Sequence, residues 1–294
     1  MRYIPIHYDE PLFRHPSEAN SVILQVTLGC SWNQCAFCEM YTSKKFAVKD
    51  ESKLFSEINL AAESMPNARK IFLADGNAFV LSFGKLKRIV GHLHKSFKRI
   101  QRVSAYALPS DIAGKTDEEL RALAESGLTL LYVGIESGDD EVLRLINKSE
   151  TYNSTAEQLN RVHKAGIKTS VMILTGLGGR KYSKQHAIQS AKILNEIQPY
   201  YASTLVLSFP YGEDHYRKKF SGEYVHMKVT ELLDELEIFI QHTNLDATIF
   251  RSDHASNYLI LKGVLGKDKQ RFLEEIARAR NQPSVLREEW MRGL

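Results

Sequence analysis

The chain has 294 residues, of which 43% are hydrophobic and 25% are charged, and its formal net charge is +4. This composition is typical of a globular protein, and the length allows one barrel-sized α/β domain or two ordinary domains. No apolar run approaches the roughly 18 residues of a membrane span, and residues 1–7 lack the apolar core of a signal peptide. We therefore expect no membrane partner and a cytoplasmic location.

Short apolar or β-branched runs alternate with helical patterns over the first two thirds of the chain. The predicted strands are Val22–Leu28, Ile71–Ala74, Arg102–Ala107, Leu130–Glu136, Thr169–Leu174 and Ser203–Ser208. Between them, the capping pattern Thr116–Glu119 opens one helix, and Ser154–Glu157 opens a second. A third helix begins near Ser183 and ends before Pro199.

Six strand–helix alternations indicate parallel strands and an α/β fold. We predict a partial (β/α)6 TIM-like barrel, although periodicity alone leaves an open doubly wound sheet as an alternative. After Ser208 the pattern predicts the helix Thr230–Thr243, the strand Ala247–Arg251 and the helix Lys267–Arg280. The predicted organisation is therefore a core barrel with an N-terminal extension over residues 1–210, and a short C-terminal α+β cap over residues 211–294.

Cys30, Cys35 and Cys38 are the only cysteines, and they lie within nine consecutive residues that follow a turn at Gly29. An odd number at short spacing is a poor disulfide framework, and a cytoplasmic location keeps thiols reduced. Three thiolates can hold three irons of a [4Fe–4S] cluster and leave the fourth iron open. Buried structural thiols, or a zinc site with His254 as fourth ligand, are the alternatives.

The run Thr27-Leu-Gly-Cys30…Cys35-Ala-Phe-Cys38 resembles the cluster loop of the radical S-adenosylmethionine superfamily, and the similarity extends from about Ser21 to Ser208. It is similar to the branch that contains methylthiotransferases, oxygen-independent coproporphyrinogen dehydrogenases and the Elongator catalytic subunit. The spacing departs from the family, because four residues separate Cys30 from Cys35 where the family usually has three.

The resemblance implies two cofactors, a [4Fe–4S] cluster and S-adenosylmethionine. In this family the open iron binds S-adenosylmethionine, and an electron from the cluster cleaves a carbon–sulfur bond to give methionine and a 5′-deoxyadenosyl radical. The radical then abstracts hydrogen from the substrate. The resemblance also implies the metal ligands Cys30, Cys35 and Cys38, and the cofactor contacts Phe37, Asp75, Gly76, Asn77, Glu136, Ser137, Thr175 and Leu207.

Two of these contacts have specific expected roles. Asp75-Gly76-Asn77 follows the second strand, where the family contacts the amino group of the cofactor, although a plain Asp-Gly turn is the alternative. Glu136 follows the fourth strand and is expected to accept a hydrogen bond from a ribose hydroxyl. The alternative for Glu136 is a solvated strand end beside the start of a helix.

The sequence identifies no catalytic side chain and leaves the substrate open. Tyr106, Arg251 and His254 are candidate substrate contacts. The alternative for Tyr106 is a tyrosine packed in the core, and the alternative for Arg251 and His254 is a surface loop without a function. Three cysteines leave none for a second cluster, which argues against sulfur insertion. We predict a small-molecule substrate and an electron donor such as flavodoxin or ferredoxin, with tRNA or a peptide as other substrates. The rival functions are a zinc-binding protein and an iron–sulfur electron carrier or sensor without radical catalysis.

Overall fold

The computed structural model describes residues 6–292, which fall into two compact units. The first unit comprises the chain up to Asn33 together with Met40–Val133 and Gln158–Thr169. The second comprises Gln34–Glu39, Gly134–Glu157 and the chain from Ser170 onward. The predicted boundary near residue 210 stays a prediction. Across residues 6–292, no helix is both long enough and apolar enough to cross a membrane.

One eight-stranded sheet has the strand order β1-β4-β5-β6-β7-β8-β9-β10. The strands are β1 (Val22–Gln25), β4 (Lys70–Ala74), β5 (Arg102–Tyr106), β6 (Leu128–Glu136), β7 (Lys168–Thr175), β8 (Tyr201–Val206), β9 (Ile249–Ser252) and β10 (Leu261–Val264). The pairs β1–β4, β4–β5, β5–β6, β7–β8 and β8–β9 are parallel, whereas β9 and β10 are antiparallel. The predicted α/β class with parallel strands is confirmed.

The first predicted strand, Val22–Leu28, is in fact two strands. β1 belongs to the large sheet, and β2 (Thr27–Leu28) pairs antiparallel with β3 (Ala47–Val48) in a separate two-stranded sheet. The prediction of one continuous strand was wrong because the chain leaves the large sheet after Val26, whose N–H still bonds Ala74 O at 2.6 Å. The loop that carries Cys30 therefore begins from β2.

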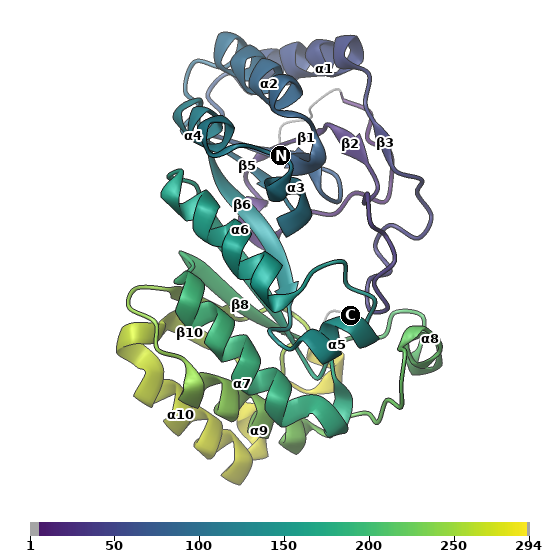
Figure 1. The fold of residues 1–294 in the computed structure, drawn as a ribbon, viewed down its shortest axis with the longest axis vertical. Coiled ribbons are helices and arrows are strands. Elements are labelled where there is room, and N and C mark those ends of the chain that lie inside the picture. The colour runs from purple at the N-terminus through teal and green to yellow at the C-terminus, as the bar shows by residue number, and fades with distance from the viewer. Residues whose placement is uncertain (1–5, 293–294) are drawn as a thin grey trace. The chain divides into compact units, whose positions relative to one another are not determined.

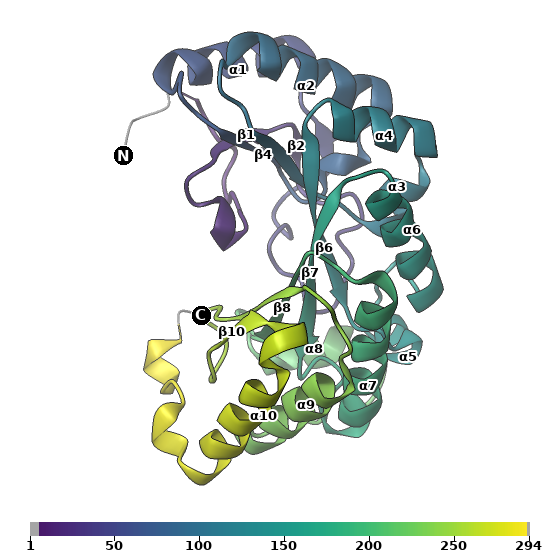
Figure 2. The same cartoon turned by 90° about the vertical axis from the view of Figure 1, so that its left-hand side faces the viewer.

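Three helices of the first unit, α1 (Glu51–Ser64), α2 (Phe83–Ser96) and α4 (Asp117–Glu125), lie side by side over its strands (Figure 2). The capping box predicted for α4 is confirmed, since Thr116 Oγ1 accepts from Glu119 N at 3.2 Å and Thr116 N donates to Glu119 Oε2 at 3.0 Å. The shorter elements of this unit are η1 (Pro16–Glu18), η2 (Ala78–Val80) and α3 (Pro109–Ala113).

In the second unit, α7 (Gly179–Ile197), α9 (Val229–His242) and α10 (Leu265–Asn281) form one layer of packed helices (Figure 1). The two C-terminal helices agree with the predicted ranges to within a few residues. β9 and β10 continue the sheet beside β8, and the sequence pattern did not reveal β10. Its other elements are α5 (Asp140–Leu145), α8 (Glu213–Lys219), η3 (Pro283–Val285) and η4 (Glu289–Met291). The helix α6 (Tyr152–Lys164) is divided between the units, because residues from Gln158 onward belong to the first.

Two helix starts differ from the prediction. α6 begins at Tyr152, and Thr151 caps it, because Thr151 Oγ1 accepts from Ser154 N at 3.2 Å and Thr151 N donates to Ser154 Oγ at 2.9 Å. The predicted cap at Ser154 was wrong because this hydroxyl serves as the partner of the true cap. α7 begins at Gly179, about one turn before Ser183, where glycines with positive φ allow the sharp entry.

Candidate cofactor site

The loop that carries Cys30 is held by close backbone packing in the first unit. Gly29 has a φ of +68° and makes the turn out of β2. A Cβ added at Gly76 would lie 2.6 Å from Cys30 Cα and 2.6 Å from Gly29 O, so only glycine fits there. The segment after β4 and the Cys30 backbone therefore touch.

Asp75 is fully buried, and one of its oxygens is saturated. Asp75 Oδ2 accepts from Lys44 Nζ at 2.8 Å, from Gly29 N at 3.3 Å and from Gln25 Nε2 at 3.4 Å. Asp75 Oδ1 is also buried, and among residues 6–292 it has no hydrogen-bond partner. This oxygen is available to a donor outside the described chain, since a buried carboxylate oxygen is costly to leave unpaired.

Asn77 is buried and directs its amide at the same loop. Its Oδ1 accepts from Ser31 N at 2.9 Å, and its Nδ2 donates to Ser31 Oγ at 2.8 Å. The same Nδ2 lies 3.0 Å and 3.1 Å from the two carboxylate oxygens of Asp111. These bonds connect α3 to the residue after Cys30, so the amide of Asn77 acts as a tether of the loop.

Tyr106, at the end of β5, packs in an aromatic cluster of the first unit. Its ring lies edge-on to Phe72, with centroids 5.1 Å apart, and to Tyr132, with centroids 5.9 Å apart. Burial raises the pKa of the Tyr106 phenol, and the nearby carboxylates of Glu18 and Asp75 raise it further. The phenol is therefore a neutral group at ordinary pH, and a substrate contact for it stays a prediction.

Glu136 ends β6 in a left-handed conformation, with a φ of +67°. Ser137 N donates to Ile135 O at 2.8 Å and closes a three-residue turn around Glu136. A Cβ at Gly134 would overlap Glu136 Oε1, so the glycine provides the space for the carboxylate. Glu136 Oε2 is buried and has no hydrogen-bond partner among residues 6–292.

Lys148 connects Glu136 with the cysteine segment of the second unit. Its buried Nζ lies 3.4 Å from Glu136 Oε1 and 5.9 Å from the centroid of the Phe37 ring. Burial alone would lower the pKa of Lys148, but the charges of Glu136, Cys35 and Cys38 act against it and the net shift is upward. Burial raises the pKa of Glu136, and Lys148 opposes that shift. Lys148 thus supplies a positive charge beside two thiols and a carboxylate.

Ser137, Thr175 and Leu207 make contacts within the interior of the second unit. The Ser137 hydroxyl bonds His186 Nδ1 at 2.8 Å, and Leu207 N donates to Thr175 O at 2.9 Å. Leu207 also belongs to a buried apolar cluster against which Phe37 packs. A cofactor role for these residues stays a prediction.

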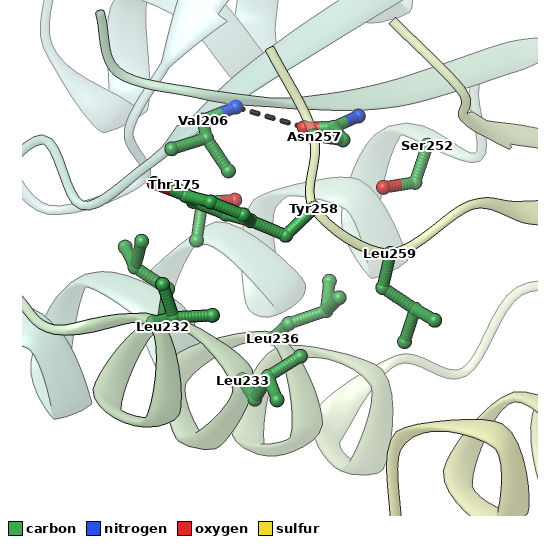
Figure 3. Close-up of a pocket in the computed structure, with 10 residues that line it drawn as sticks. Thr175, Val206, Leu232, Leu233, Leu236, Ser252, Asn257, Tyr258 and Leu259 are labelled. Atoms are coloured by element: carbon green, nitrogen blue, oxygen red, sulfur yellow. Dashed lines mark hydrogen bonds between the residues drawn. The ribbon is translucent and has the colours of Figure 1, made fainter. Parts of the chain in front are cut away.

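Thr175 also lines a small pocket between the ends of β7 and β8 and the helix α9 (Figure 3). Leucines of α9 form one wall, and the Tyr258 ring lies between them and Val206. Asn257 Oδ1 accepts from Val206 N at 2.9 Å and so continues the edge of β8. The lining is mostly apolar, and Thr175, Ser252 and Asn257 are among its few polar residues.

Arg251 and His254 lie on β9 and in the loop that follows it. Arg251 is exposed, and its Nη1 donates to Phe250 O at 3.0 Å. His254 Nδ1 bonds Ser256 Oγ at 2.9 Å, and burial lowers the pKa of the imidazole. These contacts are local, and a substrate role for either side chain stays a prediction.

Sequence reasoning missed Lys44, Asp111 and Lys148, which contact the predicted site residues. None of the three stands in a motif, and each is far along the chain from the residue it contacts. The closest signal is at Lys148, because it follows Asn147, whose φ of +55° suits the asparagine-rich ends of helices. The asparagine indicates a turn at the end of the helix, but it does not indicate that the Lys148 ammonium contacts Glu136.

The residues present fit an iron–sulfur cluster and a cationic cofactor. None of the three cysteines forms a disulfide, and thiolates are the ligands that iron–sulfur clusters use. Cys30 belongs to the first unit, and Cys35 and Cys38 belong to the second. Within residues 6–292, no three His, Cys, Asp or Glu side chains gather closely enough to be assigned as a metal site from their positions. The fit therefore rests on the donor set and on the unpaired oxygens of Asp75 and Glu136.

Comparison with known proteins supports the same chemistry. Residues 24–191 match the family model described as the Radical SAM superfamily. An uncharacterized methyltransferase of Synechocystis sp. is 27% identical over 170 residues, which are 55% of this chain and 30% of that protein. The heme chaperone HemW of Bacillus subtilis is 23% identical over 138 residues, which are 46% of this chain and 36% of HemW. The chain thus spans about a third of the length of these two relatives.

Among solved structures, coproporphyrinogen III oxidase (HemN) from Escherichia coli is similar, with a TM-score of 0.58 at 18% identity. The match covers 75% of this chain and 51% of HemN, which is itself described as a radical SAM enzyme. At this identity the likeness concerns the fold. It agrees with the predicted partial TIM-like barrel.

Proposed function

The chain belongs to the radical SAM superfamily, and from this premise we propose that it is an enzyme that cleaves S-adenosylmethionine to begin a radical reaction. Members of this family use a [4Fe–4S] cluster and S-adenosylmethionine. Cys30, Cys35 and Cys38 would hold the cluster. When bound, the cluster supplies the electron that cleaves the cofactor into methionine and a 5′-deoxyadenosyl radical, which abstracts hydrogen from the substrate.

The observation that carries this proposal is the buried, unpaired oxygen of Glu136 on the unit that also holds Cys35 and Cys38. A buried acceptor without a partner costs free energy in the empty protein, and a ribose hydroxyl or a positive group of the cofactor would satisfy it. The turn at Glu136 and the missing Cβ of Gly134 aim and accommodate this carboxylate. The arrangement fits binding of a cationic nucleoside cofactor.

Lys148 has a supporting electrostatic role. Three thiolates and Glu136 bring negative charge, and the buried ammonium of Lys148 lies beside Glu136, Cys35 and Cys38. Opposite charges at short range stabilise one another strongly when they are screened from water. We infer that Lys148 stabilises the deprotonated ligands that a cluster requires.

In the first unit, the roles of Asp75 and Asn77 divide. Asp75 Oδ1 is the group available to the amino group of the cofactor, because Asp75 Oδ2 is used by Lys44, Gly29 and Gln25. The side-chain amide of Asn77 is hydrogen-bonded to Ser31 and Asp111, so we assign Asn77 to holding the loop. Gly76 permits the close approach to Cys30.

The finer part of the proposal concerns partners. We propose a small-molecule substrate, since three cysteines leave none for the second cluster that sulfur insertion consumes. The electron donor would be a low-potential protein such as flavodoxin or ferredoxin. The reaction would take place in the cytoplasm, where thiols stay reduced.

The experiment that tests the proposal is anaerobic reconstitution followed by cofactor binding. We expect about four irons and four sulfides per chain, and a loss of both when Cys30, Cys35 or Cys38 is replaced by alanine. The electron paramagnetic resonance signal of the dithionite-reduced protein should change when S-adenosylmethionine is added. Stoichiometric zinc without sulfide, or a cluster signal that ignores the cofactor, would contradict the proposal.

A further inference from the structure

The Glu136 turn has a backbone conformation that its own sequence does not favour. Glu136 has a φ of +67°, a region that residues with a Cβ seldom adopt, and the turn closes through the bond from Ser137 N to Ile135 O. Such a conformation persists only where the surrounding structure holds it in place. Identifying what holds this turn therefore identifies what aims the Glu136 carboxylate.

The three residues after Glu136 are clamped to α7. Ser137 Oγ bonds His186 Nδ1 at 2.8 Å, and Gly138 N donates to Ser190 Oγ at 3.0 Å. His186 and Ser190 are four residues apart, so they share one face of the helix. Both are buried, with exposed fractions of 1% and 0%.

Backbone packing reinforces the clamp. A Cβ at Gly138 would overlap the carbonyl of Gln189, so the turn lies directly against the α7 backbone. Gln185 Nε2 donates to Asp139 Oδ1 and Oδ2, each at 3.1 Å. The clamp therefore spans about one turn of α7 and grips every residue of Ser137–Asp139.

His186 is itself oriented from its other side. The Ser137 hydroxyl accepts from Asp139 N at 3.0 Å, so its own proton is available to His186 Nδ1. On the other side of the ring, His186 Nε2 faces Glu235 Oε1 of α9 at 3.8 Å, an ion-pair distance that is too long for a hydrogen bond. Glu235 Oε1 also accepts from Gly176 N at 2.6 Å, in the loop after β7.

Ser137, His186 and Glu235 have the order of groups seen in nucleophilic triads, but their burial argues for another role. Unlike the unpaired oxygens of Asp75 and Glu136, the Ser137 hydroxyl is already bonded to His186 Nδ1 and Asp139 N, and Glu235 is buried, so these groups are engaged within the protein. These three side chains instead connect the loop after β6 to the loop after β7, through His186 of α7 and Glu235 of α9. Their role is therefore to support the two loops structurally.

We propose that His186 and Ser190 are positioning residues that hold the left-handed Glu136 turn and so aim its carboxylate, with Glu235 orienting His186. This inference rests on the proposed cofactor role of Glu136. Neither side chain touches the cofactor in this account. Each acts through Ser137 or Gly138.

The test is a double-mutant cycle on reconstituted protein, with the dissociation constant for S-adenosylmethionine as the main readout. His186→Ala is expected to weaken binding about tenfold, and Ser190→Ala by about threefold to tenfold, as the loss of one buried hydrogen bond implies. His186→Asn keeps an acceptor near the Nδ1 position and should recover most of the loss. Iron content should stay unchanged in all three variants.

The second arm of the cycle separates positioning from general damage. In a Glu136→Ala background, His186→Ala should change the dissociation constant by less than about twofold, because the carboxylate that it aims is already gone. Lys184→Ala, an exposed change on the same helix, is the matched control and should leave binding unchanged. Amide exchange at residues 136–139 should quicken in Ser190→Ala, whose Gly138 N loses its acceptor.

The outcomes distinguish this inference from the proposed function. If Glu136→Ala binds the cofactor normally, the assignment of Glu136 fails. If Glu136→Ala weakens binding but His186→Ala and Ser190→Ala do not, the positioning role is wrong. Equal losses from His186→Ala in both backgrounds would also overturn it, since the effect would then bypass Glu136. Should His186→Ala fail to fold, Ser190→Ala and His186→Asn decide the question by the same comparison.

Discussion

At the scale of single residues, the candidate site depends on glycines, which leave space, as well as on polar side chains. Gly76 and Gly134 leave room for Cys30 and for the Glu136 carboxylate, respectively. Neither glycine has a positive φ, so their conformations are open to other residues and the constraint is purely one of space. A methyl group at either position would displace a group that we assign to cofactor binding.

Gly76→Ala tests this constraint directly. The added Cβ would lie 2.6 Å from Cys30 Cα, so the loop must shift, and we expect fewer irons per chain after anaerobic reconstitution. Gly91→Ala is the matched control, because a Cβ at Gly91 meets nothing within 4 Å. That control should load iron normally and gain roughly 0.5–1 kcal/mol in the free energy of unfolding, as alanine replaces glycine within a helix. Normal iron content in Gly76→Ala would refute the packing argument.

Lys115 provides a prediction about pH. Its buried Nζ donates to Phe79 O at 2.8 Å and to Asp111 O at 3.0 Å, and burial lowers its pKa from 10.5 to about 8. Between these two pH values the unfolded chain binds a proton on Lys115 that the folded chain has released, so stability from this group rises with pH. The lowered pKa therefore changes the free energy of unfolding by at most about 3–4 kcal/mol over this pH range.

Lys115→Met lacks this proton, so the comparison of the two proteins isolates its contribution. The free energy of unfolding of the unmodified chain, relative to Lys115→Met, should increase from pH 8 to pH 10.5. Urea unfolding at several pH values measures the difference. A difference that stays constant over this range would contradict the lowered pKa of Lys115 in the folded protein.

At the scale of elements, the loop after β2 is held by Asn77, which follows β4 and is itself bonded to Asp111 of α3. Asn77 bonds Ser31 through both N and Oγ, and Asp111 accepts from the same amide. The tether is short and buried, and it acts on the residue next to Cys30. The order of the cysteine loop in the first unit is therefore set by residues distant in the sequence.

Asn77→Ala removes this tether. It leaves Ser31 N and Asp111 without their amide partner, which is expected to cost about 1–3 kcal/mol in the free energy of unfolding. The loop should also release its iron faster to a chelator, because Cys30 is less well held. The exposed Asn67→Ala serves as the control for both thermal unfolding and iron release. Chelator kinetics identical to those of the unmodified protein would rule out the tether.

The elements that could be predicted are those with local signals. The capping box at Thr116 and the parallel order of the strands follow from neighbouring residues and from the alternation of patterns. The cap of α6 was misassigned because Thr151 and Ser154 bond each other, and the sequence does not reveal which of the two is the cap. β10 was missed because its pairing with β9 depends on a partner strand and not on its own periodicity.

The same distinction explains the site. The three cysteines can be identified as candidate ligands from their spacing in the sequence. Lys148 can be identified only from the fold, which places it beside Glu136. The family resemblance implies a cofactor contact for Asn77, which stays a prediction, and its position after a strand does not distinguish a ligand contact from the loop tether that we assign to it. Long-range pairings of this kind are set by tertiary structure, which no local pattern encodes.

At the scale of the whole molecule, the account joins a family assignment to residues on two units. The family match covers residues 24–191, and the candidate residues fall in both units, with Cys30 and Asp75 in the first and Glu136 and Lys148 in the second. The proposed function therefore draws on residues of both units, and its central claim is that the chain cleaves S-adenosylmethionine.

The most direct measurement of that claim is the formation of 5′-deoxyadenosine by the reconstituted chain. Given dithionite and S-adenosylmethionine without oxygen, the protein should release 5′-deoxyadenosine and methionine in equal amounts, and Cys38→Ala should release neither. A fully loaded cluster that leaves S-adenosylmethionine intact under these conditions would contradict the account.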